Sequence, residues 1–380
     1  MSHDYNKESI DLHKLHHGKI ETAVKVPMEN RDDLSRAYTP GIAEISREIG
    51  KDQTLAREYT IKRNTVAIIS DGSAILGLGN LGALAAIPVM EGKAAILKSF
   101  AGVDAFPICL DTQDPEEIIK AVKQIAPVFG AVNLEDIQAP KCFEIEERLR
   151  RELSIPVMHD DQWGTSTVVL GGLINALKIT GRGEGKESKI VVNGVGAAGV
   201  ATSRLLLAYG FTNIVFCDSK GIIHKDRSDL TKEKLELLNA SSASVSQGRL
   251  EDAVKYADVF VGVSKAGALT SEMVATMAQD PIVFALANPI PEIMPDAAKA
   301  AGVAVIATGR SDFPNQLNNS LIFPGLFKGA LAKGIKQFEI TTFTKAALAL
   351  ASHVQNPDAE NILPTMFDKS LVDVIAATVE

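Results

Sequence analysis

The stretch that decides the fold is Lys189–Gly199, with the sequence K-I-V-V-N-G-V-G-A-A-G. Its apolar run Ile190–Val192 predicts a buried strand, and Ala198–Tyr209 predicts the helix that follows. Between strand and helix lie the glycines of a G-x-G-x-x-G pattern, namely Gly194, Gly196 and Gly199. A glycine turn of this spacing between a strand and a helix is typical of a Rossmann unit that binds a dinucleotide.

Each glycine has a physical role in such a turn. Gly194 permits the tight turn, Gly196 lets the backbone approach a pyrophosphate, and Gly199 lets helix and strand pack closely. The helix N-terminus adds free N–H groups and the positive end of the helix dipole. The residues between the glycines, which are Val195, Ala197 and Ala198, therefore belong to the same predicted cofactor site. A glycine turn without a ligand is the alternative, and the matching strand, helix and acidic residue argue against it.

That acidic residue is Asp218, directly after a second predicted strand, Asn213–Cys217. A carboxylate at this position can accept both hydroxyls of the adenosine ribose and would repel a 2′-phosphate. The sequence therefore favours NAD over NADP. Lys220 lies two residues further on and could soften that preference.

Strands and helices alternate on both sides of the motif. Further predicted strands lie at Thr65–Ser70, Ala105–Leu110, Ala131–Leu134, Ile155–Met158, Val259–Val263, Ile282–Leu286 and Val303–Ile306. This alternation predicts an α/β protein of two domains, each with a mostly parallel sheet. The polar run Gly181–Ser188 is the best candidate for a junction, Gly164–Lys178 predicts a long helix before it, and Leu331–Glu380 is expected to be helical.

Two acidic pairs directly follow two of these predicted strands. Glu135-Asp136 follows Ala131–Leu134, and Asp160-Asp161 comes shortly after Ile155–Met158. Ligands of α/β sheets bind at the carboxyl ends of the strands, and carboxylates that converge there repel one another unless a cation joins them. Hard oxygen ligands suit Mg²⁺ or Mn²⁺. From residue types alone, a metal site and ordinary loop or surface charges are about equally good explanations of these acidic pairs.

Composition excludes several classes of function. The chain has 380 residues, 46% hydrophobic and 23% charged, with a net charge of −8 and no Lys/Arg block, so nucleic acid and anionic membranes are poor candidate partners. Its three cysteines show no paired spacing and favour a reducing compartment. The first residues lack an apolar core, and no apolar run reaches the length of a membrane span. These features predict a cytoplasmic protein.

Several strings, taken together and in order, resemble the malic enzymes, specifically the short bacterial form. They cover about residues 20–330 and comprise Y-T-P-G (38–41), S-D-G-S-A-I-L-G-L-G-N (70–80), P-V-M-E-G-K (88–93), V-N-L-E-D (132–136), H-D-D-Q-W-G-T (159–165), the glycine motif, F-A-L-A-N-P (284–289) and N-N-S-L-I-F-P-G (318–325). The resemblance implies oxidative decarboxylation of malate to pyruvate and CO₂ with NAD and a divalent metal. It also implies a catalytic and metal domain over residues 1–163 and a Rossmann domain over 164–380, with 340–380 free to pack back on the first.

The resemblance assigns roles position by position. Lys93 matches the catalytic base, Tyr38 the acid, and Asp160 a supporting carboxylate. Glu135, Asp136 and Asp161 match the metal ligands, and Asn288 and Asn319 match side chains that hold the substrate, with Asn288 also close to the cofactor. A buried, neutral Lys93 would take the hydroxyl proton of malate as hydride leaves for NAD⁺, and Tyr38 would protonate the enolpyruvate left after loss of CO₂.

One departure concerns the substrate carboxylate. Larger members of the family carry an arginine in the glycine-rich loop, where this chain has Ser73 and Ala74. Ser73, the two asparagines and backbone N–H groups are the expected replacements. The resemblance further suggests a homodimer, in which the segment that carries Tyr38 could complete a neighbour's site.

Three other readings remain open. A lyase could decarboxylate oxaloacetate at the same metal site without net redox, although the intact glycine motif and Asp218 argue against it. The malolactic type keeps NAD bound and yields lactate, and the chain is shorter than expected for that class. A nucleotide-sensing module would explain the Rossmann half but leave Lys93, Tyr38 and the carboxylates without a role.

Overall fold

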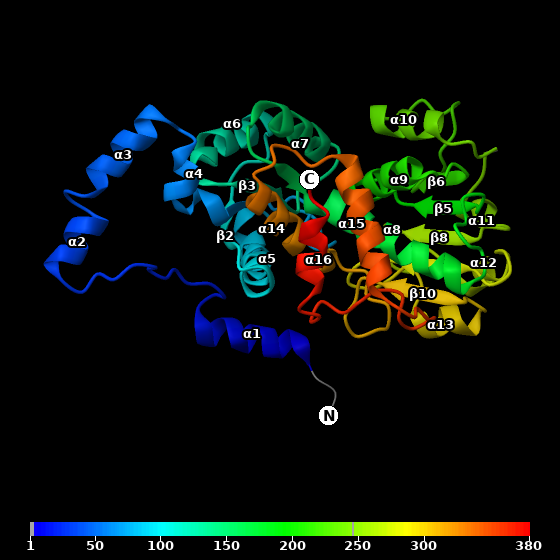
Figure 1. Ribbon diagram of the computed structural model, residues 1–380. Helices are drawn as coiled ribbons and strands as arrows, with labels where there is room; N and C mark the ends of the chain where they lie inside the picture. Colours follow the sequence, from blue (N-terminus) through cyan, green and yellow to red (C-terminus); the bar gives the residue numbers. More distant parts are fainter. Residues whose placement is uncertain (1–3, 245–246) are drawn as a thin grey trace.

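The structure is a computed structural model that describes residues 4–244 and 247–380. Two sheets organise it, each between layers of helices (Figure 1). The first sheet has the order β2-β1-β3-β4, and every neighbouring pair is parallel. Its strands are β1 (Thr65–Ser70), β2 (Asp104–Cys109), β3 (Ala131–Leu134) and β4 (Val157–His159).

Alternating side chains divide the first sheet between two layers. Val66 and Ile68 of β1 belong to the core that includes α5 and α14, whereas Ala67 and Ile69 face α6 and α7. The elements around this sheet are η1 (Ile61–Asn64), α5 (Ala83–Ile96), η2 (Leu97–Ala101), α6 (Pro115–Ile125), η3 (Ala126–Val128) and α7 (Lys141–Glu152).

The second sheet has the order β10-β9-β8-β5-β6-β7, with only the β6–β7 pair antiparallel. Its strands are β5 (Ile190–Asn193), β6 (Ile214–Asp218), β7 (Gly221–Ile222), β8 (Val259–Gly262), β9 (Ile282–Ala285) and β10 (Val305–Thr308). The order along the sheet reverses between β5 and β8, and in the first sheet between β1 and β3. Open α/β sheets bind ligands at these two points, beyond the carboxyl ends of the strands.

Helices cover both faces of the second sheet. Helices α8, α9 and α15 share one core with the first sheet, and α11, α12 and α13 cover the opposite face. The helices that follow the first domain's strands are α8 (Asp160–Ile179), α9 (Ala197–Tyr209), α10 (Lys232–Ala240), α11 (Leu250–Ala253), α12 (Ser271–Val274), α13 (Pro295–Ala300), η4 (Asn319–Leu321), α14 (Phe323–Lys333), α15 (Ile340–His353) and α16 (Leu371–Ala377).

The fold confirms the predicted class and corrects two details. Helix α8 begins at Asp160, not at Gly164, so the second acidic pair occupies the first turn of a helix and not a loop. The C-terminal region is helical only in part, because residues 354–370 form an irregular segment between α15 and α16. The domain boundary after residue 163 stays a prediction, and α8 runs across it without a break.

The N-terminal helices form an arm. It contains α1 (Tyr5–His16), α2 (Arg31–Ala37) and α3 (Ile42–Lys51), and α4 (Leu55–Tyr59) leads from it into the body. Figure 1 shows α2 and α3 projecting away from both sheets. None of the residues of α1 or α3 is buried, although α3 carries apolar residues along one side, including Ile42 and Ile45. In the described part of the chain, no helix is long and apolar enough to cross a membrane.

Candidate active site

The two acidic pairs meet at the carboxyl edge of the first sheet. Strand β3 delivers Glu135 and Asp136, and its parallel neighbour β4 delivers Asp160 and Asp161. Because Asp160 and Asp161 form the first turn of α8, the positive end of the helix dipole favours their negative charge. Parallel pairing of two short strands thus brings together carboxylates that lie 25 residues apart in the chain.

Three of these carboxylates form a compact cluster. One oxygen from each of Glu135, Asp136 and Asp161 lies within 4.8 Å of the others. The amide of Asp136 donates to Asp161 Oδ2 at 2.9 Å, and Asn133 Nδ2 donates to Glu135 Oε2 at 3.0 Å. Asp136 Oδ2 is buried and has no hydrogen-bond partner. An all-oxygen cluster with a free buried acceptor fits a hard divalent cation.

Electrostatics point to the same conclusion. Burial, reinforced by the nearby charge of Asp161, raises the pKa of Asp136 to about 7. Burial also raises the pKa of Glu135 well above its ordinary value, although Lys93 opposes this. Carboxylates held together in this way ionise at a cost, and a cation among them would remove that cost.

Lys93 reaches the cluster from α5. It is 8% exposed, its Nζ lies 3.0 Å from Glu135 Oε1, and it donates to Asp160 Oδ2. Nζ also lies 4.3 Å from the centre of the Phe323 ring. Burial disfavours the ammonium, but Asp160, Glu135 and Asp161 together outweigh it and hold the pKa of Lys93 above its ordinary value. Lys93 is therefore charged here and not neutral, because three carboxylates surround it.

The glycine-rich loop after β1 places Ser73 in the interior. Ser73 is 1% exposed, and its hydroxyl donates to Asp71 Oδ1 at 2.6 Å and accepts from the amide of Gln138 at 2.9 Å. Lys141 pairs with the other oxygen of Asp71 at 2.5 Å. The substrate contact of Ser73 stays a prediction, and the hydroxyl would have to give up one of these partners to make it.

The two asparagines come from separate segments of the Rossmann half, Asn288 from the loop after β9 and Asn319 from the start of η4. A Cβ on Gly77 would lie 2.5 Å from the carbonyl oxygen of Asn288, which shows how closely the glycine-rich loop approaches this exposed residue. A Cβ on Gly164 would lie 2.9 Å from Cβ of Asn319 and 2.0 Å from Asp160 Oδ1. Asn319 is thus placed beside the Lys93–Asp160 pair.

Two buried glutamates near the site, Glu146 and Glu292, are not predicted from the sequence. Glu146 of α7 accepts from the amide of His159 at 2.9 Å and from Gln162 Nε2 at 3.0 Å, which fixes the turn into α8. Glu292 accepts from the amides of Ser264 and Ala287 at 2.8 and 3.0 Å, and so ties the loop after β8 to the loop that carries Asn288. Nothing in the local sequence distinguishes these acids from surface glutamates.

The glycine motif has the geometry expected of a dinucleotide turn. Gly194 has a φ of 105°, and a Cβ there would lie 2.4 Å from the carbonyl oxygen of Val263. A Cβ on Gly199 would lie 1.8 Å from the carbonyl oxygen of Gly194, whereas Gly196 faces open space. A cavity of about 890 Å³ lies over this turn and extends to Asp218, Lys220 and Arg249 on one side and Ser264 and Lys265 on the other.

Asp218 lies in that cavity wall but has other partners. Arg227 donates to both of its carboxylate oxygens, at 2.9 and 2.8 Å, and Lys234 Nζ and the amide of Lys220 donate at 2.7 and 2.9 Å. Partial burial works against ionisation, but these donors hold the pKa of Asp218 at about 2. Its predicted contact with the ribose stays a prediction.

Tyr38 is the one predicted catalytic residue that lies outside this assembly. It connects α2 to α3 on the arm and is 65% exposed. Figure 1 places both helices far to one side of α5, which carries Lys93. The structure therefore groups Lys93 with the four carboxylates and keeps the segment that carries Tyr38 apart from them.

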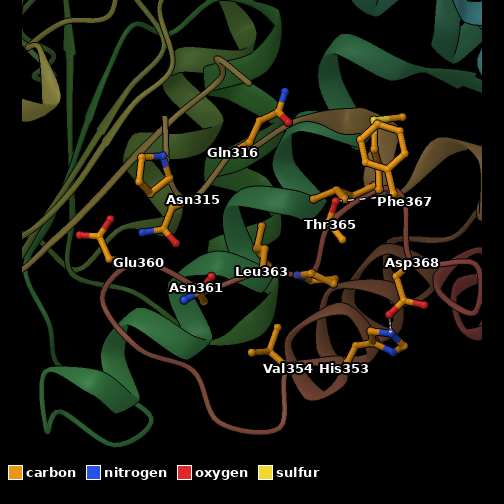
Figure 2. Close-up of a pocket in the computed structure, with 14 residues that line it drawn as sticks. Asn315, Gln316, His353, Val354, Glu360, Asn361, Leu363, Thr365, Phe367 and Asp368 are labelled. Atoms are coloured by element: carbon orange, nitrogen blue, oxygen red, sulfur yellow. Dashed lines mark hydrogen bonds and ion pairs between the residues drawn. The ribbon is translucent and has the colours of Figure 1, made fainter. Parts of the chain in front are cut away.

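A second cavity is separate from all of these residues. It measures about 680 Å³ and lies between the loop after β10 and the segment that joins α15 to α16. Figure 2 shows His353 and Asp368 on one side of it, joined at 2.9 Å, with Asn315 and Gln316 opposite. None of the residues predicted from the sequence lines this cavity.

Comparisons with known proteins agree with this geometry. The family described as "Malic enzyme, N-terminal domain" matches residues 17–150, and "Malic enzyme, NAD binding domain" matches residues 163–379. A protein of Bacillus subtilis (strain 168), named "Bifunctional malic/malolactic enzyme", is 50% identical over 98% of this chain and 92% of its own length. The "NAD-dependent malic enzyme" of Geobacillus stearothermophilus is 52% identical over 95% of this chain and 76% of its own length.

A solved structure matches the whole fold. The NAD-dependent malic enzyme of Thermotoga maritima superposes with a TM-score of 0.94 at 45% identity, over 98% of both chains. The Bacillus subtilis relative also corrects one argument from the sequence. That relative is nearly the same length as this chain and has "malolactic" in its name, so the length of the chain does not exclude that activity.

Proposed function

The chain belongs to the malic enzyme family, and we propose that it oxidatively decarboxylates (S)-malate to pyruvate and CO₂, reducing NAD⁺, with Mn²⁺ or Mg²⁺. The observation that carries this proposal is the position of Lys93. It lies in contact with Glu135 and Asp160, next to an all-oxygen carboxylate cluster. A base beside a cation site is what removal of a proton from a hydroxyl requires.

The metal ligands in this proposal are Glu135, Asp136 and Asp161. Their support is the compact cluster of oxygens and the unpartnered, buried Asp136 Oδ2. A bound divalent cation would polarise the hydroxyl and carbonyl oxygens of the substrate and balance the carboxylate charges that now keep Lys93 protonated. The preference between Mn²⁺ and Mg²⁺ is left to experiment.

Lys93 and Asp160 handle the proton on the hydroxyl. Lys93 Nζ takes that proton as hydride leaves C2 of malate for the nicotinamide. Asp160 Oδ2 already accepts from Nζ and holds the resulting ammonium in place. Asp160 Oδ1 is buried without a partner, so this carboxylate has capacity for one further donor from the substrate.

Asn288 and Asn319 are proposed to hold the substrate. Asn288 lies in the loop after β9 that approaches Gly77, and Asn319 begins η4 beside Asp160. Asn288 also lies in the loop that Glu292 fixes through the amide of Ala287. Because Ser73 is engaged by Asp71 and Gln138, backbone N–H groups of the glycine-rich loop are the better candidates for the second carboxylate of malate.

Tyr38 protonates the enolpyruvate in this proposal, and it does so in a neighbouring subunit. Its support is geometric, because Tyr38 is 65% exposed between α2 and α3, two helices that Figure 1 shows far from α5, the helix that carries Lys93. The arm also exposes Val24, Met28, Leu34 and Ile42, an apolar surface of the kind that a second copy covers. The proposed unit is thus a homodimer that exchanges its arms.

We also propose that the protein works in the cytoplasm. The three cysteines of the chain are all free, which is typical of a reducing compartment.

Initial rates test this proposal. Malate and oxaloacetate are each supplied with NAD⁺ and Mn²⁺, and NADH and pyruvate are measured together. Formation of both products from malate is the expected result. Pyruvate from oxaloacetate without any oxidation of malate would instead identify a dedicated oxaloacetate decarboxylase.

A second candidate activity is the malolactic reaction, which yields lactate and CO₂ from malate. The name of the Bacillus subtilis relative favours it. The same assay distinguishes it, because lactate accumulates without net NADH if the cofactor stays bound and is reoxidised by the pyruvate formed.

A further inference from the structure

Asp218 has no capacity left for a ribose. A carboxylate offers about four acceptor positions, two on each oxygen. Oδ1 accepts from Arg227 Nη1 and from the amide of Lys220, both at 2.9 Å. Oδ2 accepts from Arg227 Nη2 at 2.8 Å and from Lys234 Nζ at 2.7 Å. All four positions are therefore occupied by donors of the protein itself.

These contacts are packed and mutually supported. The side chains of Asp218, Arg227 and Lys234 are 14%, 9% and 16% exposed. Asp229 supports these contacts, because its carboxylate accepts from Arg227 and, at 2.7 Å, from Lys220 Nζ. Bidentate pairing between a guanidinium and a carboxylate is among the strongest side-chain contacts, so a ribose hydroxyl competes poorly for Asp218.

The surroundings are electropositive. The cations at this end of the cavity outnumber the carboxylates: Lys220, Arg227, Lys234 and Arg249 stand against Asp218, Asp229 and Glu251. An acid that excludes NADP works by accepting ribose hydroxyls and by repelling a 2′-phosphate. Here the occupied oxygens cancel the first effect, and the surrounding cations cancel the second.

We propose that Asp218 anchors Arg227 and Lys234 instead of binding ribose, and that the site accepts a 2′-phosphate, so that the chain uses NADP⁺ as well as NAD⁺. Lys220 and Arg249, which line the cavity, are the residues that meet the added phosphate. Lys220 is 65% exposed, and its single pair with Asp229 is readily exchanged for a doubly charged ligand. The proposal rests on the proposed function only for the redox use of the cofactor, not for its binding.

Two small probes test the binding claim in the full chain, without malate, metal or turnover. Adenosine 2′,5′-bisphosphate and 5′-AMP differ only by the 2′-phosphate, and calorimetry gives the dissociation constant of each. The bisphosphate is expected to bind at least as tightly as 5′-AMP. Bisphosphate binding more than about tenfold weaker than that of 5′-AMP would overturn the proposal, since a repelled phosphate costs at least that much.

Variants of Lys220 and Arg249 test whether these residues bind the 2′-phosphate. K220A/R249A is expected to weaken the bisphosphate about tenfold or more, as for a lost charge-assisted contact, and to leave 5′-AMP within about twofold. Lys299→Ala is the matched control. Lys299 is an exposed lysine of α13 that pairs with Glu360, and its loss should change neither dissociation constant. Equal losses for both probes in the double variant would contradict the assignment of Lys220 and Arg249.

Arg227→Gln gives an effect of predictable sign. It frees oxygens of Asp218, so the preference should move toward 5′-AMP and toward NAD⁺ by about tenfold. If Asp218 already received the ribose, the preference would stay as in the wild type, and the proposal would fail. Arg227→Lys keeps the charge and serves if the first variant does not fold. Malate oxidation with NAD⁺ alone, together with rejection of the bisphosphate, would remove this inference and leave the proposed function intact.

Discussion

At the scale of single residues, the environment of Lys93 decides its chemistry. The side chain is held by two carboxylates and a phenylalanine ring, a setting built to keep an amine in one place. Its charge in this setting depends on whether the neighbouring carboxylates are balanced by a cation. In the proposed mechanism, the same residue is an ion-pair partner in the metal-free protein and a base once a cation is bound.

Lys93→Ala is expected to lower the rate of malate oxidation by about 10²–10⁴-fold, the usual contribution of a general base. Added methylamine should restore part of the rate, because the cavity left by the side chain admits a small amine. Lys98→Ala, on the exposed turn that follows α5, is the control and should retain its rate. Full activity in the Lys93 variant would end the assignment of the base.

The pKa of Asp136 predicts how the stability of the metal-free protein depends on pH. Because folding raises this pKa from its ordinary value to about 7, the contribution of the protonated carboxyl is present below about pH 4 and is lost as pH rises through 7. The melting temperature should therefore fall between pH 5 and pH 8, and Mn²⁺ should restore more of it at pH 8 than at pH 5. Asp136→Asn should flatten this dependence, and an unchanged slope in that variant would contradict the account.

At the scale of elements, close packing of α9 against β5 defines the dinucleotide turn. A methyl group on Gly199 would overlap the carbonyl oxygen of Gly194 at 1.8 Å. Gly199→Ala is expected to destabilise the fold by about 1–3 kcal/mol and to weaken NAD⁺ binding, because the turn must move. Gly92→Ala, where a methyl group on α5 meets nothing within 4 Å, should be neutral or stabilising in the same melting experiment. Equal melting temperatures for the two variants would count against the packing argument.

The element scale also shows what sequence can and cannot predict. Apolar runs predict every strand of the two sheets except the two-residue β7, and parallel pairing places Glu135 and Asp161 at one edge. The sequence predicts the start of α8 at Gly164, four residues after its observed start, because Asp160 and Asp161 have the residue types of a loop. The anchoring of Asp218 was not predictable, because Lys234 lies on a helix whose position no local pattern fixes.

At the scale of the whole molecule, the arm is the feature that a single chain leaves unexplained. Sequence indicated helices there but not their direction, since no local pattern says which surface an amphipathic helix such as α3 will meet. A dimer that exchanges arms would cover these helices and bring Tyr38 to a site that lacks an acid.

Complementation between two inactive variants tests this arrangement. In a dimer of Lys93→Ala with Tyr38→Phe, one of the two sites regains both native residues if Tyr38 acts across the interface. Random mixing should then recover about a quarter of the wild-type rate. Mixing Lys93→Ala with Asp160→Asn is the control, because these residues touch within one chain and should not complement. If the first mixture recovers no more activity than the control, Tyr38 acts in its own subunit.

The most direct test of the central claim is the stoichiometry of a single reaction containing malate, NAD⁺ and Mn²⁺. NADH, pyruvate and CO₂ are counted together, before and after a chelator is added. The account predicts one NADH and one CO₂ for each pyruvate, and no reaction once the metal is removed. Pyruvate or CO₂ without matching NADH, or a rate that survives the chelator, would contradict it.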